Sequence, residues 1–348
     1  YYLNLLVKLA DLQQELQSGR FEYPDTTSFI LRERGKTRYI TADGVEGRLV
    51  KSALTEEQLL PAIRPYIIYD SGASVKGRGP SFTRQRFETH LHKFYQQNGS
   101  NEGYLLLIDF SKYYDNILHP EFMQRLRTYC YDETTLDLVD KILKGSRIDV
   151  SYMTDEEVEA AYHHVFNSLE YQQIPEELKT ALKFLCKHVN IGDPVAQIAG
   201  ISYPIPLDNY IKIVRGVKFY GRYMDDLYVI HNDKKYLEEL LGDIVAVANS
   251  LGIFINTKKT RIVKLSSSYR FLQIQYSLTS TGRVVRKINP KRITAMRRKL
   301  KRLCKKVDLE TYDNTFKSWY GNYASLMSRQ QRKNIKKLYY TLREENYS

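Results

Sequence analysis

The sequence is poor in the residues that build cross-linked or metal-stapled scaffolds. Its 348 residues include only three cysteines, Cys130, Cys186 and Cys304, which lie far apart. This spacing argues against a disulfide framework and against a zinc site, so we expect three reduced, structural thiols. The seven histidines have no metal-ligand spacing either, and we expect the adjacent His163 and His164 at the surface.

Long apolar runs are also missing. No segment has the roughly 20 consecutive apolar residues that a transmembrane helix needs, and no signal-peptide pattern is present. We therefore expect a soluble, intracellular protein that does not cross a membrane. What the chain does have is positive charge, because 53 Lys and Arg against 40 Asp and Glu give a formal net charge of +13. This excess predicts a polyanionic partner, and nucleic acid is favoured over an anionic membrane surface.

The length suits two or three subdomains with a substantial core, and no repeat or low-complexity linker divides the chain. The acidic stretch over residues 149–177 is expected to be a helical insertion that its charge holds away from nucleic acid. Gly252 stands where a preceding helix should have its C-cap. Apolar periodicity and composition predict strands near residues 32–41 and helices over residues 3–17, 55–63, 82–97 and 234–251.

The tetrapeptide Tyr-Met-Asp-Asp at residues 223–226 constrains function most strongly. It lies between two β-favouring runs, residues 217–220 and 227–230, and therefore predicts a hairpin with two carboxylates at its tip. Asp is common in hairpin turns without any function. The whole tetrapeptide in this strand context is far rarer, and hard carboxylate ligands on a tight turn suit a pair of Mg²⁺ ions. The pattern favours phosphoryl transfer chemistry.

A third carboxylate ends the mostly apolar run from Tyr104 to Asp109, which is typical of a buried strand. A carboxylate in that place needs a cation, a metal ion or a hydrogen-bond network, because burying it unpaired is costly. One alternative is that Asp109 caps the next element. The other is that it shares a metal ion with Asp225 and Asp226. Tyr114 follows five residues later, with Asp115 next to it.

Asp109 with Tyr114, and residues 223–226, resemble the first and third palm motifs of reverse transcriptases. Other segments resemble further motifs of the family in the right order: residues 34–40 the basic fingers strand, 191–197 the motif lining template and nucleotide, 252–260 the fourth palm motif, and 271–274 the primer grip. The pattern of residues 191–197 is closest to diversity-generating retroelement or phage-defence enzymes of bacteria. It has Ala196 where the retroelement enzymes have Ser.

The resemblance implies an α+β fold, the right-hand polymerase with fingers, a palm of antiparallel sheet backed by helices, and a helical thumb. It implies a bacterial, cytoplasmic protein. The expected division of the chain is residues 1–103 as fingers with an N-terminal helix, 104–119 as palm with the first motif, 120–190 as a helical fingers or palm insertion, 191–280 as palm with the nucleotide-lining motif, the hairpin and the primer grip, and 281–348 as a basic helical thumb.

The resemblance also implies an RNA-directed DNA polymerase that adds deoxynucleotides to a primer 3′-hydroxyl. Asp109 and Asp225, with Asp226 as an additional ligand or a nearby carboxylate, would hold two Mg²⁺ ions, which Mn²⁺ could replace. Tyr114 would lie beneath the sugar and exclude a 2′-hydroxyl. Lys259, or the equally near Lys258, would protonate the departing pyrophosphate.

Further contacts follow from the same resemblance. Lys36 and Arg38 would bind the triphosphate. Residues lining the nucleotide and template would be Ile191, Gly192, Gln197, Tyr223 and Met224. Nucleic acid would contact Lys76 and Arg78 on the loop of residues 74–79, Phe271 and Leu272 at the primer grip, and Arg297, Arg298, Lys301 and Arg302 on a thumb helix. The loop could instead be a flexible surface loop, and the basic helix could be solvated or bind a membrane surface. We expect Trp319 in the thumb core.

The partners expected are an RNA template, a DNA or RNA primer and dNTPs, with a cognate noncoding RNA or a small accessory protein as additional candidates. A bacterial retroelement is the favoured setting. One alternative is an antiphage defence polymerase that makes DNA with an atypical template or none. The other is a catalytically silent RNA-binding maturase or scaffold, which the three carboxylates disfavour.

Overall fold

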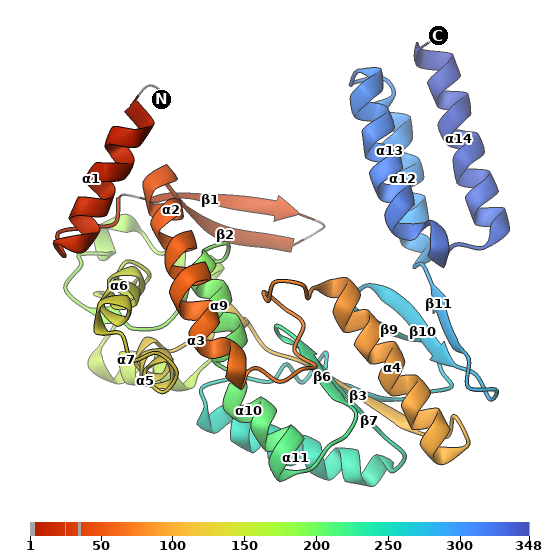
Figure 1. The fold of residues 1–348 in the computed structure, drawn as a ribbon, viewed down its shortest axis with the longest axis horizontal. Coiled ribbons are helices and arrows are strands. Elements are labelled where there is room, and N and C mark those ends of the chain that lie inside the picture. The colour runs from red at the N-terminus through yellow and green to blue at the C-terminus, as the bar shows by residue number, and fades with distance from the viewer. Residues whose placement is uncertain (1–3, 25, 34–35, 348) are drawn as a thin grey trace. The chain divides into compact units, whose positions relative to one another are not determined.

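The computed structural model describes residues 4–24, 26–33 and 36–347, without the side chains of Glu33 and Lys36. The helices and strands of the chain are drawn in Figure 1. By their internal contacts they divide into two compact units. The first comprises Tyr1–Thr83, Leu106–Val229 and Lys235–Arg261, and the second Arg84–Leu105, Ile230–Lys234 and Ile262–Ser348. The five-part division expected from the sequence stays a prediction.

The first unit holds a hairpin of two long strands, most of a four-stranded sheet and most of the helices. Its elements are α1 (Leu5–Gln17), β1 (Thr26–Glu33), β2 (Lys36–Asp43), α2 (Val45–Ala53), a π-helical turn (Leu54–Leu59), α3 (Leu60–Ile63), most of β3 (Tyr104–Asp109), α5 (His119–Arg127), α6 (Glu133–Lys144), β4 (Ile148–Asp149), α7 (Asp155–His163), α8 (Ser168–Tyr171), β5 (Phe184–Leu185), α9 (Pro194–Ser202), α10 (Ile205–Asn209), β6 (Tyr220–Tyr223), β7 (Asp226–His231) and α11 (Lys234–Ser250).

These elements confirm most of the secondary structure expected from the sequence, but β6 begins only at Tyr220, so most of the β-favouring run over residues 217–220 precedes the strand. The apolar run becomes β3, whose four central residues are buried. In α11 the apolar residues recur at helical spacing, with Leu237, Leu240 and Ile244 buried, and Gly252 ends the segment in the left-handed conformation at φ +72°. Strand β6 pairs antiparallel with β7, and β7 is followed in the sheet by β3.

The acidic insertion is only partly the helical segment expected. Helix α7 begins with a capping box between Thr154 and Glu157, as its sequence favours. The insertion is closed, however, by a small antiparallel sheet in which Ile148 pairs with Leu185. Both residues are buried. The sequence pattern missed these strands because two residues are too few to show an alternation.

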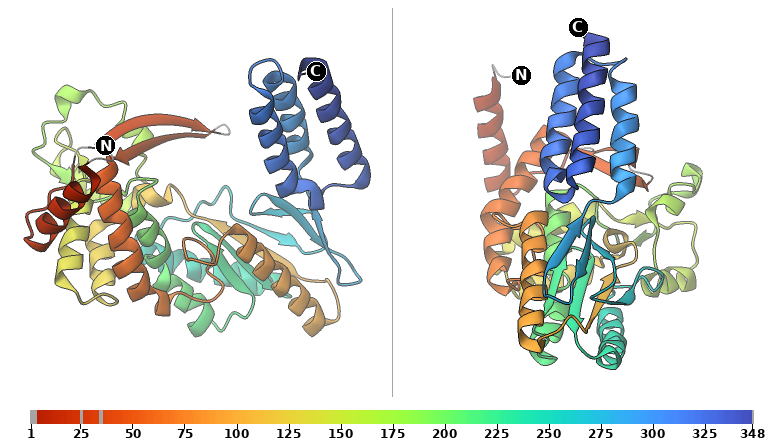
Figure 2. Two further views of the ribbon diagram at one scale, coloured as in Figure 1. Left: turned by 45° about the horizontal axis from the view of Figure 1, so that its top comes forward. Right: turned by 90° about the vertical axis from the view of Figure 1, so that its right-hand side faces the viewer.

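The second unit packs α4 on a sheet and ends in a helical bundle. Its elements are most of α4 (Pro80–Asn98), β8 (Arg261–Lys264), β9 (Tyr269–Phe271), β10 (Ile274–Leu278), β11 (Val284–Lys287), α12 (Pro290–Leu303), α13 (Leu309–Tyr323) and α14 (Arg329–Tyr347). Strand β10 lies between β11 and β9, and Phe87 of α4 packs on Phe271 and Tyr276. Helices α12, α13 and α14 run side by side, as both views of Figure 2 show.

Trp319 is not the centre of the bundle core. It is half-buried, whereas Phe316 is buried and stacks on Tyr339 with ring centroids 4.0 Å apart. The core therefore consists of the stacked Phe and Tyr rings, and Trp319 lies at its edge against Tyr323. The three cysteines are free thiols, and His163 and His164 are exposed as expected. Within the described part of the chain, no helix is long and apolar enough to cross a membrane.

The buried His119 predicts how stability depends on pH. Its Nε2 lies 2.6 Å from the carbonyl oxygen of His188, and burial lowers the pKa of His119 from 6.5 to about 4. Between these values the unfolded chain binds a proton that the folded chain does not. The contribution of His119 is thus present above pH 6.5 and is lost as the pH falls through about 4.

Acidification from pH 7 to pH 5 is therefore expected to cost roughly 2 kcal/mol of unfolding free energy through His119 alone. Urea unfolding at the two pH values measures this loss. His119→Gln should flatten the pH dependence, while the exposed His163→Gln should leave it unchanged. Equal slopes in the wild type and His119→Gln would contradict the assignment.

Candidate active site

The Tyr-Met-Asp-Asp segment forms the hairpin tip that its sequence predicts. Tyr223 pairs with Asp226, which leaves Met224 and Asp225 as a two-residue loop. Met224 adopts the left-handed region at φ +53°, an uncommon conformation for a residue other than glycine. All four residues are half-buried. The hairpin thus places two adjacent carboxylates at one point of the sheet.

The end of β3 lies beside this tip. The amide of Phe110 donates to the carbonyl oxygen of Asp225 at 3.3 Å. A third segment joins them, because the amide of Asn256 donates to the carbonyl oxygen of Asp109 at 2.8 Å. Three stretches that are far apart in the sequence therefore meet at the predicted carboxylates.

Asp109 has a cationic partner in this structure. The ammonium nitrogen of Lys259 lies 2.7 Å from its Oδ2, and the side chain of Asp109 is 15% exposed while that of Lys259 is 56% exposed. The amide of Lys259 donates to the carbonyl oxygen and the side-chain oxygen of Asn256, which fixes the backbone position of Lys259. Sequence reasoning left Lys258 as an equal alternative, and the structure brings Lys259 to the carboxylate.

The donor set suits a hard divalent cation. Asp109, Asp225 and Asp226 offer only carboxylate oxygens, the ligands that Mg²⁺ prefers. In the part of the chain that is described, no group of three His, Cys, Asp or Glu side chains is arranged to hold a metal ion, and Lys259 is the cation paired with Asp109. The chemistry of the residues fits a metal site, and their roles as ligands stay a prediction.

Tyr114 lies against the hairpin. Its hydroxyl donates to the sulfur of Met224 at 3.5 Å, and a Cβ atom added at Gly200 would lie 2.9 Å from that hydroxyl oxygen. Burial and, next, the charge of Asp225 raise the pKa of Tyr114 to about 12. The hydroxyl of Tyr114 therefore stays protonated beside the carboxylates. Because Gly200 has no side chain, the Tyr114 ring has space next to it.

The predicted nucleotide-lining residues surround the start of α9. Ile191 is half-buried and the exposed Gly192 is left-handed at φ +101°, which favours glycine there. Gln197 is exposed, and its side-chain oxygen accepts a hydrogen bond from Ser74 at 3.1 Å. The loop of residues 74–79 therefore reaches this motif.

Sequence reasoning missed the buried cation behind this motif. The ammonium of Lys51 lies 2.5 Å from Asp193 and 2.8 Å from Asp43, and Lys51 is only 4% exposed. Asp193 also caps α9 by accepting from the amide of Val195. Lys51 thus ties β2, which carries Arg38, to the start of α9. In the sequence, Lys51 is one more lysine on an amphipathic helix, and nothing marks it as buried.

The basic residues predicted near the triphosphate and on the loop of residues 74–79 have different surroundings. The side chain of Lys36 lies outside the described residues, as do Arg34 and Gly35, whereas Arg38 is half-buried and pairs with Leu31 across the hairpin. Arg78 donates to the carbonyl oxygens of Ile68 and Ser71 and so holds its own loop together. Lys76 is exposed. Of the two loop cations, Lys76 is the one turned to solvent.

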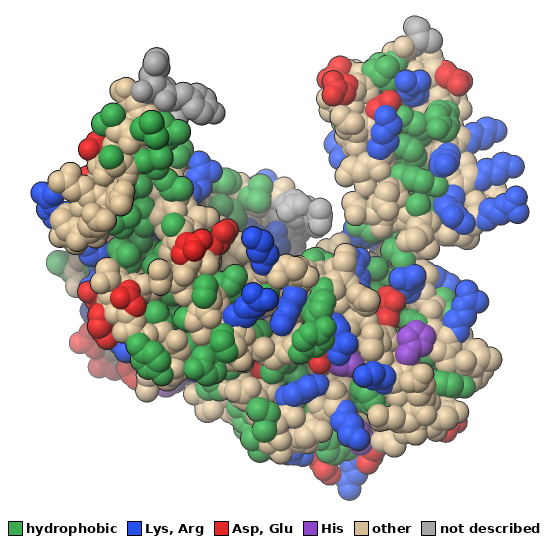
Figure 3. Space-filling view, in the orientation of Figure 1, with side chains coloured by type: hydrophobic (Ala, Val, Ile, Leu, Met, Phe, Trp, Pro, Cys, Tyr) green, Lys and Arg blue, Asp and Glu red, His purple; other side chains and the backbone are tan. Residues whose placement is uncertain are grey.

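The predicted nucleic-acid contacts of the second unit also differ among themselves. The ring of Phe271 is buried against Phe87, while Leu272 lies in the turn after β9 at φ +40°. The four basic residues predicted on α12, Arg297, Arg298, Lys301 and Arg302, are exposed. Figure 3 shows a further gathering of Lys and Arg over α14, which sequence reasoning did not single out. Its exposed members are Arg329, Arg332, Lys333, Lys336 and Lys337.

Residues 30–276 match the reverse transcriptase (RNA-dependent DNA polymerase) family. The chain therefore belongs to this family, and its fold is the right-hand polymerase fold with mixed helices and antiparallel sheets. Members of the family generally use divalent metal ions. No curated protein sequence matches the chain significantly.

Two of the solved structures that it resembles are telomerases. One is the telomerase from Candida albicans in complex with a TWJ fragment of telomeric RNA, with 11% identity, a TM-score of 0.53, and 96% of this chain matched to 57% of that one. The other is apo telomerase from Candida tropicalis, with 14% identity, a TM-score of 0.47, and 76% of this chain matched to 48% of that one. The chain thus spans about half the length of these proteins.

Proposed function

We propose that this chain is an RNA-directed DNA polymerase that extends a primer 3′-hydroxyl with deoxynucleotides. The observation that carries the proposal is the meeting of Asp109 with the hairpin of Asp225 and Asp226, beside Tyr114 and Lys259. Family membership supports the reaction. The telomeric RNA in the Candida albicans structure supports an RNA partner, which the excess of basic residues also favours.

In this proposal each residue has a chemical task. Asp109, Asp225 and Asp226 would hold divalent ions, Mg²⁺ or Mn²⁺, which when bound would lower the pKa of the 3′-hydroxyl and neutralise charge on the leaving pyrophosphate. Lys259, whose ammonium lies 2.7 Å from Asp109, donates a proton to the departing pyrophosphate. Arg38, together with Lys36, binds the triphosphate.

Tyr114 is expected to exclude ribonucleotides. Its ring lies against the hairpin tip, and truncation would open the space that a 2′-hydroxyl needs. Tyr114→Ala should lower the preference for dNTPs over rNTPs by roughly tenfold or more, measured as a ratio of kcat/KM values. Tyr114→Phe keeps the ring and should keep the preference. Equal discrimination in Tyr114→Ala and the wild type would contradict a steric role.

A bacterial retroelement is the setting we favour, with the enzyme in the cytoplasm and with a noncoding RNA or a small accessory protein as further partners. The motif at residues 191–197 supports this choice by its similarity to bacterial retroelement enzymes in Ile191, Gly192 and Gln197, although Ala196 stands where those enzymes have Ser. An antiphage polymerase would use the same carboxylates, so the template requirement distinguishes the two.

Nucleotide incorporation by the purified chain with Mg²⁺ tests the proposal. The reactions compare poly(rA)·oligo(dT), a primed DNA template and no template. Extension on the RNA template supports the proposed reaction. Product without template would favour the defence polymerase. Absence of product in all three reactions, from protein that is folded and binds the duplex, would favour the scaffold function.

A further inference from the structure

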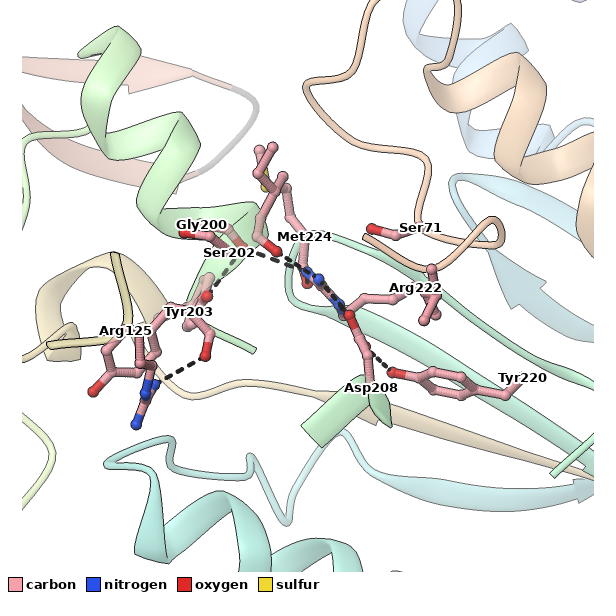
Figure 4. A network of polar contacts seen from close by, with 12 residues as sticks. Ser71, Arg125, Gly200, Ser202, Tyr203, Asp208, Tyr220, Arg222 and Met224 are labelled. Atoms are coloured by element: carbon pink, nitrogen blue, oxygen red, sulfur yellow. Dashed lines mark hydrogen bonds and ion pairs between the residues drawn. The ribbon is translucent and has the colours of Figure 1, made fainter. Parts of the chain in front are cut away.

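A fully buried ion pair lies directly behind the hairpin tip. Arg222 is 0% exposed and immediately precedes the Tyr-Met-Asp-Asp segment. Its Nε and Nη2 lie 2.9 Å and 2.7 Å from the two carboxylate oxygens of Asp208 on α10. The hydroxyl of Tyr220 donates to the same carboxylate at 2.5 Å (Figure 4). The charges of Arg222 and Asp208 therefore neutralise each other, and the Asp208 carboxylate accepts hydrogen bonds from protein groups without exposure of Arg222 to solvent.

Besides its ion pair with Asp208, the Arg222 guanidinium donates to three backbone carbonyl groups. Nη1 donates to the carbonyl oxygen of Met224 at 3.0 Å and to that of Gly200 at 3.4 Å. Nη2 also donates to the carbonyl oxygen of Ile201 at 2.9 Å. One planar group therefore connects α10, the end of α9 and the tip of the hairpin, as Figure 4 shows. Burial lowers the pKa of Arg222, but Asp208 outweighs it, so the net shift is upward and the group stays charged.

Met224, whose carbonyl oxygen accepts from Arg222, has an unfavourable backbone conformation. Met224 is left-handed, a conformation that persists in a residue other than glycine only where its surroundings hold it. The backbone of Arg222 is fixed as well, because its amide donates to the backbone carbonyl oxygen of Asp70 and its carbonyl oxygen accepts from the amide of Gly72, both at 3.1 Å. The Arg222 side chain, fixed at its backbone and by Asp208, therefore binds the strained residue next to Asp225.

We propose that Arg222 is a positioning residue for the carboxylates of Asp225 and Asp226. Its bond to the carbonyl of Met224 fixes the two-residue loop, and Asp208 fixes the guanidinium. The catalytic consequence rests on the proposed function, whereas the effect on the hairpin does not. An ion pair that only stabilised the fold would need Asp208 alone, and the bond to Met224 is what separates the two roles.

Arg222→Lys tests this, because it keeps a positive charge beside Asp208 while one ammonium cannot reach Asp208 and three carbonyl groups together. Arg125→Lys is the matched control. The guanidinium of Arg125 is also largely buried and donates to the carbonyl oxygens of Tyr203 at 2.9 Å and of Leu251 at 3.3 Å, neither of which is in the hairpin.

Hydrogen exchange of peptides covering residues 219–231 provides the first readout and requires no catalytic activity. Arg222→Lys should exchange about tenfold faster at the hairpin tip under native conditions, while peptides from α11 stay protected. Arg125→Lys should leave the tip as in the wild type. Uniformly faster exchange in Arg222→Lys would show a merely structural role and overturn the proposal.

Steady-state incorporation provides the second readout. Arg222 is completely buried and donates to Asp208 and to backbone carbonyl groups, so Arg222→Lys should lower kcat by about ten- to a hundredfold while KM for the dNTP changes little. The half-saturating Mg²⁺ concentration should rise. If the wild type extends no primer, the proposed function fails while the exchange experiment still decides the role of Arg222.

A double variant guards against loss of folding. Arg222→Met/Asp208→Leu removes both buried charges together, a replacement that folded proteins often tolerate. It should fold and show the same loosened hairpin and lowered kcat as Arg222→Lys. Wild-type exchange at the tip with unchanged kcat in either variant would overturn the proposal.

Discussion

Replacing Asp225 by Asn is expected to reduce templated nucleotide incorporation by at least about a thousandfold. The substitution keeps the size of the side chain and removes the charge that would bind a divalent cation. The backbone of Asp225 should hold its place, because its carbonyl accepts from Phe110 and the hairpin pairing on either side is unchanged. Primer extension on poly(rA)·oligo(dT), with circular dichroism to verify folding, measures the loss.

The same loss is expected for Asp109→Asn, which also takes the charged partner from Lys259. Asp137→Asn is a matched control on the exposed face of α6 and should retain wild-type activity. Chelation of divalent ions should abolish extension by the wild type, with recovery on addition of excess Mg²⁺. More than a tenth of wild-type activity in a folded Asp225→Asn would contradict the assignment of this site.

The second large effect concerns stability. Lys51→Met is expected to lower the free energy of unfolding by about 3–5 kcal/mol, because it leaves Asp43 and Asp193 buried without their shared counter-charge. The ring centroid of Tyr23 lies 5.5 Å from the Lys51 ammonium. Urea unfolding at pH 7, followed by circular dichroism, measures the change.

Lys144→Met is the matched comparison. Lys144 pairs with Asp140 at 2.7 Å, but the two side chains are 59% and 45% exposed. Solvent screens such a pair, so its loss should cost less than about 1 kcal/mol. A Lys51→Met variant as stable as Lys144→Met would show that the buried triad contributes little and that β2 is held by other contacts.

The sequence was most informative where local pattern and chemistry coincide. The apolar run before Asp109 is typical of a buried strand, and the tetrapeptide between two β-favouring runs predicted the hairpin that the structure has. These two local features identified the three carboxylates, although only the fold shows that Phe110 meets Asp225.

What the sequence could not predict are the buried charges that support the site. Lys51 lies in a helix and Arg222 in a strand, where a basic residue usually faces solvent. Asp193, the partner of Lys51, is far away in the sequence, and no sequence pattern marks Asp208 as the partner of Arg222. The choice of Lys259 over Lys258 has a different cause, since the side chain of Lys259 is 56% exposed. It depends on the turn at Asn256, whose side chain and carbonyl accept from the Lys259 amide.

The sequence of the DNA product made on a defined RNA template of mixed composition tests the central claim most directly. The purified chain, a complementary primer, all four dNTPs and Mg²⁺ are the only components. The account predicts a product complementary to the RNA from the primer to the template end, and no product with Asp225→Asn. A wild-type product unrelated to the template, or none from folded protein bound to the primed RNA, would contradict it.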